Sequence, residues 1–206
     1  MNTKPSILIT GSSTGIGAVY ADRFASRGHD LVLVARNAAR LAALADRLRG
    51  ETGVTVDVVP ADLTDAQDLA RIERRLREDA RIGVLVNNAG TTIRSGFLNQ
   101  GSEDLSRLLA LNVTAVTRLA NAAASRFVKA GEGAIINLAS VVGLAPEFGS
   151  TVYGATKAFV LFLSQGLSLE LASKGVYVQV VYLPRSARKS GSTQARTSMP
   201  FPESWR

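Results

Sequence analysis

The sequence predicts an α/β domain built on a parallel, doubly wound β-sheet. The first observation is that about six short apolar runs, typical of buried strands, alternate with longer amphipathic stretches of helical spacing. The second is a glycine-rich turn that joins the first apolar run to the first helical stretch. Because strand–helix–strand units cross over with one hand, the alternation places the strands in one sheet with helices on both faces.

Composition limits the class of protein and its partners. Apolar residues make up 46% of the 206 residues and charged residues 20%, which is ordinary for a globular protein of one domain. The chain has no cysteine and hence no disulfide framework, and we expect no metal site. No apolar run approaches membrane-spanning length, so we expect a cytoplasmic protein without a membrane partner.

The net charge of +7 does not by itself predict nucleic-acid binding. Residues 184–206 contain five basic residues and one acidic residue, which leaves +3 for the rest of the chain. The charges in that larger part are interspersed, as on a solvated surface, and do not form the basic stripe of a nucleic-acid groove. We therefore expect no nucleic-acid partner.

The glycine-rich turn follows the first predicted strand, residues 6–10, and leads into a helical stretch at 18–27. Gly11, Gly15 and Gly17 permit a tight turn and a close approach of the backbone to a ligand. The helix amino terminus that follows offers free N–H groups and the positive end of its dipole to a pyrophosphate. The turn predicts dinucleotide binding, and the alternative is a plain strand-to-helix turn.

The second predicted strand, residues 30–35, bears on the choice of cofactor. In a dinucleotide fold, an acidic residue at the end of this strand binds the ribose 2′-hydroxyl, whereas an arginine accommodates a 2′-phosphate. Arg36 stands there with no acid beside it, which favours NADP, and the alternative is an ordinary surface arginine. His29, the only histidine, precedes this strand and is expected to be a solvated surface residue rather than a catalyst.

The middle of the chain continues the strand–helix alternation. Asn37 is a plausible cap for a helix over 38–49, and the third strand is predicted at 54–60. Asp62 follows that strand and precedes a charged helix at 65–80. Its carboxylate either reaches the amino group of an adenine or only caps the helix.

Polar residues follow the next two predicted strands. The strand at 83–86 runs into the sequence Asn-Asn-Ala-Gly at 87–90, and Ser140 comes soon after the strand at 133–138. Ligands of open α/β sheets bind at the carboxyl ends of strands, although a plain turn at 87–90 is the alternative. Between these strands, a single long helix is expected over 102–130, and Asn112 in its apolar interior requires a hydrogen-bond partner.

The sequence Tyr-Gly-Ala-Thr-Lys opens the helical stretch at 155–174, which precedes the sixth predicted strand at 177–183. Tyr153 and Lys157 are four residues apart, so on a helix their side chains project to the same side. The ammonium group favours the phenolate form of the tyrosine, which suits a proton donor and acceptor for alcohol–ketone chemistry. Alone, a Tyr-x-x-x-Lys pair is a weak signal, since chance produces it readily.

Together these motifs resemble the short-chain dehydrogenase/reductase family over residues 6 to about 184. The resemblance implies a Rossmann fold that binds NAD(P) and transfers hydride between nicotinamide C4 and a small alcohol or carbonyl substrate. It implies that Tyr153 exchanges a proton with the substrate oxygen and that Ser140 positions the carbonyl. Lys157 would hold the nicotinamide ribose, and Asn112 would hold a water of the proton relay. The positions that match cofactor contacts are Gly11, Ser13, Gly15, Ile16, Gly17, Arg36, Asp62, Asn88, Ala89, Gly90, Tyr153 and Lys157.

The resemblance also implies a partner. Helices at 102–130 and 151–175 correspond to the pair through which family members often form homo-oligomers. The expected activity is that of an NADP(H)-preferring oxidoreductase, with a small alcohol or ketone as substrate. The sequence does not identify that substrate.

The carboxyl-terminal part departs from the family pattern. Arg185 follows Pro184 where the family usually has glycine, and Lys189 stands where a threonine is expected. Residues 185–206 have neither helical nor strand periodicity and are expected to be a disordered basic tail after a domain spanning 1–184, as in a truncated or frame-shifted product. The family's seventh strand would then be missing, which leaves 177–183 as a sheet edge able to associate with another chain. The alternative function is a non-catalytic remnant that binds cofactor.

Overall fold

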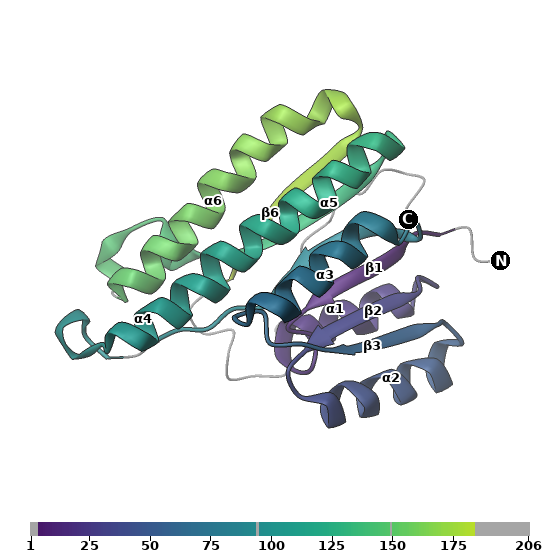
Figure 1. Ribbon diagram of the computed structural model, residues 1–206, viewed down its shortest axis with the longest axis horizontal. Helices are drawn as coiled ribbons and strands as arrows, with labels where there is room; N and C mark the ends of the chain where they lie inside the picture. The colour runs from purple at the N-terminus through teal and green to yellow at the C-terminus, as the bar shows by residue number, and fades with distance from the viewer. Residues whose placement is uncertain (1–3, 94, 149, 184–206) are drawn as a thin grey trace.

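The computed structural model describes residues 4–93, 95–148 and 150–183, and it confirms the predicted parallel sheet. The sheet has six strands in the order β3-β2-β1-β4-β5-β6 (Figure 1). The strands are β1 (Ser6–Thr10), β2 (Leu31–Ala35), β3 (Val56–Pro60), β4 (Ile82–Asn87), β5 (Gly133–Ser140) and β6 (Val176–Leu183).

Helices cover both faces of the sheet, as predicted. Side chains of α1 and α2 belong to one apolar cluster, and side chains of α3 and α5 belong to a second cluster on the opposite face, where α6 also packs. Figure 1 shows α5 and α6 running side by side along that face. The helices are α1 (Gly15–Ala25), α2 (Ala38–Thr52), α3 (Ala66–Glu78), α4 (Ser102–Leu109), α5 (Val116–Ala130) and α6 (Thr151–Leu171).

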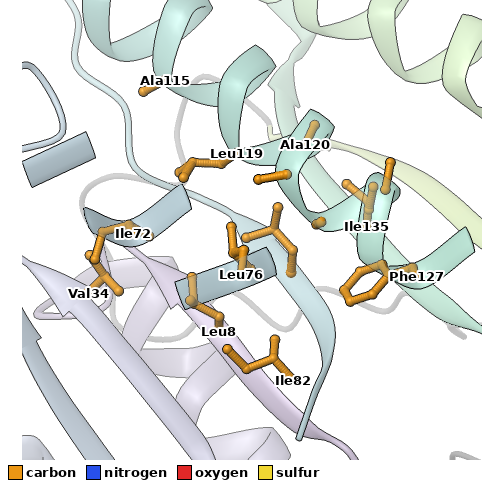
Figure 2. Packing of buried hydrophobic residues seen from close by; sticks show 14 of the residues in the cluster. Leu8, Val34, Ile72, Leu76, Ile82, Ala115, Leu119, Ala120, Phe127 and Ile135 are labelled. Carbon is orange, nitrogen blue, oxygen red and sulfur yellow. The ribbon is translucent and has the colours of Figure 1, made fainter. Parts of the chain in front are cut away.

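The core between α3, α5 and the sheet is close-packed. Figure 2 shows part of it, where Leu8 of β1, Leu76 of α3 and Leu119 of α5 gather, each no more than 1% exposed. Phe127 of α5 lies directly against the backbone at Gly133 of β5, where an added Cβ would stand 2.3 Å from the phenyl ring. This close approach fixes α5 against the start of β5.

The strand order places a crevice between β1 and β4. Strand β1 lies between β2 and β4, so the chain winds outward in opposite directions from this point. The loops after β1 and β4 therefore separate at the carboxyl edge of the sheet, which is where open α/β sheets bind ligands. Both loops carry residues singled out from the sequence, the glycine-rich turn and residues 87–90.

The predicted helical stretch over 102–130 is confirmed at both ends, but it is not a regular α-helix. A π-helical turn, Ala110–Ala115, lies between α4, which ends at Leu109, and α5. In a π-helical turn, backbone hydrogen bonds join residues that are five apart in the sequence, and such turns are frequent at functional sites. It contains Asn112, whose side chain is fully buried and hydrogen-bonded outside the helix. The apolar spacing of the segment did not reveal the extra residue.

The expectation of an exposed His29 is also wrong. The residue is only 1% exposed, and its ring stands edge-on to Phe24 with the centroids 5.6 Å apart. Its Nδ1 atom lies 2.9 Å from the carbonyl oxygen of Pro5 and donates to it. The turn between α1 and β2 packs against the start of β1, so His29 is buried although it lies in a turn. A structural role agrees with the expectation that His29 is no catalyst.

Strand β6 occupies one end of the sheet and pairs only with β5 among the described residues. The predicted tail, and with it the departure at Arg185 and Lys189, lies outside those residues, so the domain boundary and the edge association stay predictions. Within the described ranges, no helix combines the length and apolar character needed to cross a bilayer.

Candidate active site

The glycine turn after β1 is shaped by backbone that approaches backbone. Gly11 and Gly15 have φ of 64° and 59°, in the left-handed region that favours glycine. A Cβ added at Gly17 would lie 2.4 Å from the carbonyl oxygen of Gly11 and 2.6 Å from Asn88 Nδ2. The turn therefore folds tightly back on itself and against the loop after β4, as the spacing of the three glycines predicts.

Polar groups at the end of β4 hold this turn in place. Asn88 Nδ2 donates to the backbone carbonyls of Thr10 and Gly11, at 2.9 and 3.0 Å. In return, Thr10 Oγ1 accepts from the backbone N–H groups of Asn88 and Ala89, both at 3.0 Å. These four bonds bind the two sides of the crevice together, so the Asn88 amide serves the shape of the cofactor cradle.

The amino terminus of α1 is suited to an anion. Its cap residue, Thr14, makes no side-chain hydrogen bond to the helix, and the first turn has no acidic residue. By contrast, Asn37 and Asp65 accept from backbone N–H groups at the starts of α2 and α3. At Gly15, an added Cβ would meet no atom within 4 Å. The cradle thus fits the pyrophosphate of a dinucleotide, because uncapped N–H groups face open space.

Two of the predicted adenosine contacts lie beside this cradle. Arg36 is exposed directly after β2, and Asp62 follows β3. Partial burial would raise the pKa of the Asp62 carboxyl, but hydrogen bonds from Thr64 and the charges of Arg36 and Arg107 outweigh it and hold the pKa below its usual range. Helix α3 is capped by another residue, so the capping interpretation of Asp62 is wrong. Its ionised carboxylate is an acceptor near the arginine.

Tyr153 and Lys157 project to the same side of α6, as predicted. The Lys157 ammonium lies 5.8 Å from the centroid of the Tyr153 ring and donates to the backbone carbonyl of Leu138 at 2.7 Å. Lys157 is 6% exposed, whereas Tyr153 is half-buried. The bond to β5 fixes the position of the cation beside the phenol.

Asn112 finds the partners that its burial requires. Its Oδ1 accepts from the backbone N–H of Thr91 at 2.9 Å, and its Nδ2 donates to the Thr91 carbonyl at 2.9 Å and to Thr156 Oγ1 at 3.1 Å. Both N–H bonds of the amide are thus used. A Cβ added at Gly90 would lie 3.3 Å from Asn112 Oδ1 and 3.6 Å from Lys157 Nζ, so the two polar groups face the same small space.

Ser140 is the last residue of β5, and it is 5% exposed. Its hydroxyl donates to the backbone carbonyl of Leu183 on β6 at 3.3 Å. As the end of β5, the serine lies at the carboxyl edge of the sheet, in the part of the molecule where α6 begins. The structure therefore brings the four predicted catalytic residues, which come from β5, the π turn and α6, to one edge.

Comparison with known proteins identifies the family of the chain. A family model described as short chain dehydrogenase matches residues 5–194. The chain belongs to the short-chain dehydrogenase family. Vertebrate short-chain dehydrogenases are among its relatives, two of them 34% identical over 84% of this chain: very-long-chain 3-oxoacyl-CoA reductase-B of Danio rerio and 17-beta-hydroxysteroid dehydrogenase type 3 of Rattus norvegicus. The chain spans 57% of the length of each.

Two solved structures are more similar still. A bulky-bulky ketone specific alcohol dehydrogenase from Comamonas testosteroni is 59% identical, with a TM-score of 0.88 over 89% of this chain and 73% of that one. A short-chain dehydrogenase from Sphingobium yanoikuyae in complex with NADPH is 64% identical, with a TM-score of 0.87 over 87% of this chain and 70% of that one.

Sequence reasoning assigned no role to three residues that hold the candidate site together. They are Thr10, which braces the glycine turn, and Thr91 and Thr156, which hold Asn112. The signal for Thr156 was its position beside Lys157 in a helix that buries one face. Its partner is 44 residues away in the sequence, so the contact itself was not predictable.

Proposed function

We propose that this chain is an NADP(H)-dependent oxidoreductase that interconverts ketones and secondary alcohols. Three observations support the proposal. The Lys157 ammonium lies beside the Tyr153 ring, and Asn112 is hydrogen-bonded to Thr156, the residue before Lys157. Ser140 ends β5 at the carboxyl edge of the same sheet, and the amino terminus of α1 has no side-chain cap. One side of the crevice suits a dinucleotide, and the other holds the groups that move a proton.

The residues act on a substrate carbonyl in separate roles. NADPH, when bound, supplies a hydride to the carbonyl carbon. Tyr153 Oη gives its proton to the carbonyl oxygen during reduction and takes it back during oxidation. Ser140 donates a hydrogen bond that orients the carbonyl. Lys157 stabilises the phenolate that is left and binds the nicotinamide ribose, while Asn112 holds the water through which the proton is replaced. Because both side-chain N–H bonds of Asn112 are used, this water binds an oxygen of the residue.

The proposed substrates are ketones with two bulky substituents. The support is the 59% identity to the Comamonas testosteroni enzyme, which is specific for such ketones. The proposed preference for NADP(H) rests on Arg36 at the end of β2 and on the NADPH complex of the 64% identical protein. The cytoplasmic location stays a prediction.

The test is a set of reductions with NADPH and with NADH. The ketones differ in the bulk of their two substituents, and NADPH binding is followed by fluorescence in the same samples. We expect turnover of the bulky ketones with NADPH and weaker binding of NADH. Tight NADPH binding without turnover of any ketone would contradict the proposal and support the non-catalytic remnant predicted as the alternative.

We also propose that the chain forms a homo-oligomer through α5 and α6. A groove of about 300 Å³ lies between these helices and is lined by apolar and polar side chains, among them Leu163, Leu167 and Asn121. Phe162 and Leu169, also on α6, are 80% and 85% exposed. Large apolar side chains exposed on one helix are typical of a surface that another chain covers.

Light scattering after size-exclusion chromatography tests the oligomer. Replacing Phe162 with Glu should shift the protein to monomer, whereas the matched change Leu98→Glu, at a residue that is 94% exposed elsewhere, should not. Val180→Lys on β6 tests the predicted edge association separately. If only the β6 variant dissociates, the interface is the sheet edge and not the helix pair.

A further inference from the structure

Thr156 lies in the first turns of α6, directly before Lys157, and is 1% exposed. Its hydroxyl accepts from Asn112 Nδ2 at 3.1 Å and donates to the backbone carbonyl of Tyr153 at 2.7 Å. We propose that this hydroxyl is a positioning group of the active site, required for proton transfer by Tyr153 but not for cofactor binding. The inference rests on the proposed function.

The first step concerns the Asn112 amide, whose orientation is set from two sides. On one side, the backbone of Thr91 both donates to it and accepts from it. On the other side, only the Thr156 hydroxyl takes the second N–H bond. If the amide were flipped, its NH₂ group would face the backbone N–H of Thr91, and two donors cannot form a hydrogen bond. The backbone therefore selects the orientation, and the hydroxyl ties the amide to α6.

The second step concerns what this tie connects. Hydrogen bonds run from Thr91, in the loop after β4, through Asn112 in the π turn and Thr156 to the Tyr153 backbone. Three segments far apart in the sequence are thereby held in one arrangement with the backbone of Tyr153. Small displacements of reacting groups lower rates strongly, about a hundredfold for 1 Å. Losing the tie should thus affect the chemical step.

The alternative is that Thr156 only stabilises its helix, since threonine hydroxyls often bond to a carbonyl one turn back. The chain offers a matched control in Ser164, on the same helix and 2% exposed. Its Oγ accepts from Asn137 Nδ2 at 3.0 Å and donates to the Val160 carbonyl at 2.7 Å. The bonding is the same, two turns farther along the helix, and it does not involve Asn112.

The experiment compares Thr156→Val, Thr156→Ser and Ser164→Ala in ketone reduction, NADPH titration and thermal unfolding. For Thr156→Val we expect kcat to fall about tenfold while KM for the ketone and Kd for NADPH change less than about twofold. Thr156→Ser, which keeps the hydroxyl, should recover most of kcat. Ser164→Ala should lower Tm at least as much and retain kcat. Equal loss of kcat in Thr156→Val and Ser164→Ala would overturn the proposal.

A second readout does not depend on turnover. In protein labelled with ¹⁵N-asparagine, the Asn112 side-chain signal is assigned by its loss in Asn112→Ser. Thr156→Val should shift this signal and speed the hydrogen exchange of one of its two protons, and Thr156→Ser should not. An unchanged signal would overturn the proposed tie even if the enzyme is active. If the wild-type chain reduces no ketone, the proposed function and the role in proton transfer both fail, while this signal still decides whether the hydrogen bond exists.

Discussion

The two sides of the crevice are built by opposite means. On the cofactor side, the turn between β1 and α1 requires that side chains be absent, because Cβ atoms at Gly11 and Gly17 would meet backbone or amide atoms at less than 3 Å. On the catalytic side, the first turns of α6 require particular side-chain atoms, and Lys157 and Thr156 each hold a backbone carbonyl. One side is therefore sensitive to added atoms and the other to removed ones.

From this difference we expect the two sides to tolerate change differently. A backbone cradle offers its N–H groups whatever its neighbours are, provided that nothing fills it. A constellation of side chains works only while each polar group keeps its partner, since a buried donor without an acceptor is unfavourable. Four changes thus test the comparison in turn: the removal of an atom, the addition of an atom, the exchange of a charge and the addition of a proton.

Removing one oxygen should have the largest effect. Tyr153→Phe keeps the ring and takes away the proton donor, so we expect turnover to fall by about a thousandfold. NADPH affinity, measured by fluorescence, should stay within about twofold of the wild type, because the cradle lies on the other side of the crevice. Substantial turnover in this variant would mean that a different group carries the proton.

Adding one carbon should come next. In Gly17→Ala the new Cβ would lie 2.4 Å from the Gly11 carbonyl oxygen, so we expect NADPH affinity to fall by about tenfold or more and stability by about 1–3 kcal/mol. The matched control is Gly50→Ala in α2, where an added Cβ meets no atom within 4 Å and alanine favours the helix. If both variants bind NADPH like the wild type, the cradle is less tightly built than the distances indicate.

Exchanging a charge should have a smaller and selective effect. Arg36→Asp should weaken NADPH binding by about ten- to a hundredfold, since a charge-assisted bond to the 2′-phosphate contributes about 1.5–3 kcal/mol. NADH binding should be unchanged or stronger, and Arg74→Asp on α3 controls for net charge. Titration of both cofactors decides the matter, and equal affinities of the wild type for NADPH and NADH would already contradict the assignment.

Protonation of Glu73, which lies away from the crevice, should have the smallest effect, and it should act on the stability of the fold. Arg118 of α5 donates two hydrogen bonds to the carboxylate of Glu73 on α3, at 2.9 and 2.6 Å. These bonds hold the pKa of the Glu73 carboxyl below its usual range. A lowered pKa means that the pair stabilises the fold above the unfolded value of about 4.3 and that this contribution is lost as the pH falls further.

Thermal unfolding of the wild type and of Glu73→Gln between neutral pH and about pH 3 measures this contribution. The wild type should be more stable near neutrality, and the difference in Tm should shrink below about pH 4. A difference that is constant across the pH range would show that packing, and not the charge of Glu73, ties α3 to α5.

The sequence allowed the cofactor side to be predicted more completely than the catalytic side. Glycine spacing reports directly on where side chains are excluded, so the turn at Gly11 and Gly17 was recognisable. The proposed catalytic residues were recognisable as types, but their hydrogen-bond partners were not. Thr91 and Thr156 reach Asn112 only because three segments meet in space, and nothing local in the sequence encodes that meeting.

The remaining differences have the same cause. His29 was expected on the surface because turns usually are exposed, but tertiary packing against Phe24 and Pro5 buries it. The stretch 102–130 has helical spacing on both sides of the π turn. Because apolar residues in a helix recur at either three or four residues, their spacing does not reveal one inserted residue. The parallel sheet with helices on both faces, by contrast, followed from the alternation of elements, because handedness leaves few arrangements.

The π turn between α4 and α5 sets the phase of one helix relative to the other. An α-helix advances about 100° per residue, so an inserted residue rotates everything that follows by that angle. Deleting one residue between Ala110 and Ala115 would restore a continuous helix of ordinary pitch, and with it a longer run of backbone hydrogen bonds. The same deletion would turn Asn112 away from Thr91 and Thr156, or else rotate the apolar face of α5 off the sheet. The irregular turn thus works as a phase correction that lets one continuous stretch of chain serve both a packing surface and the proposed proton relay.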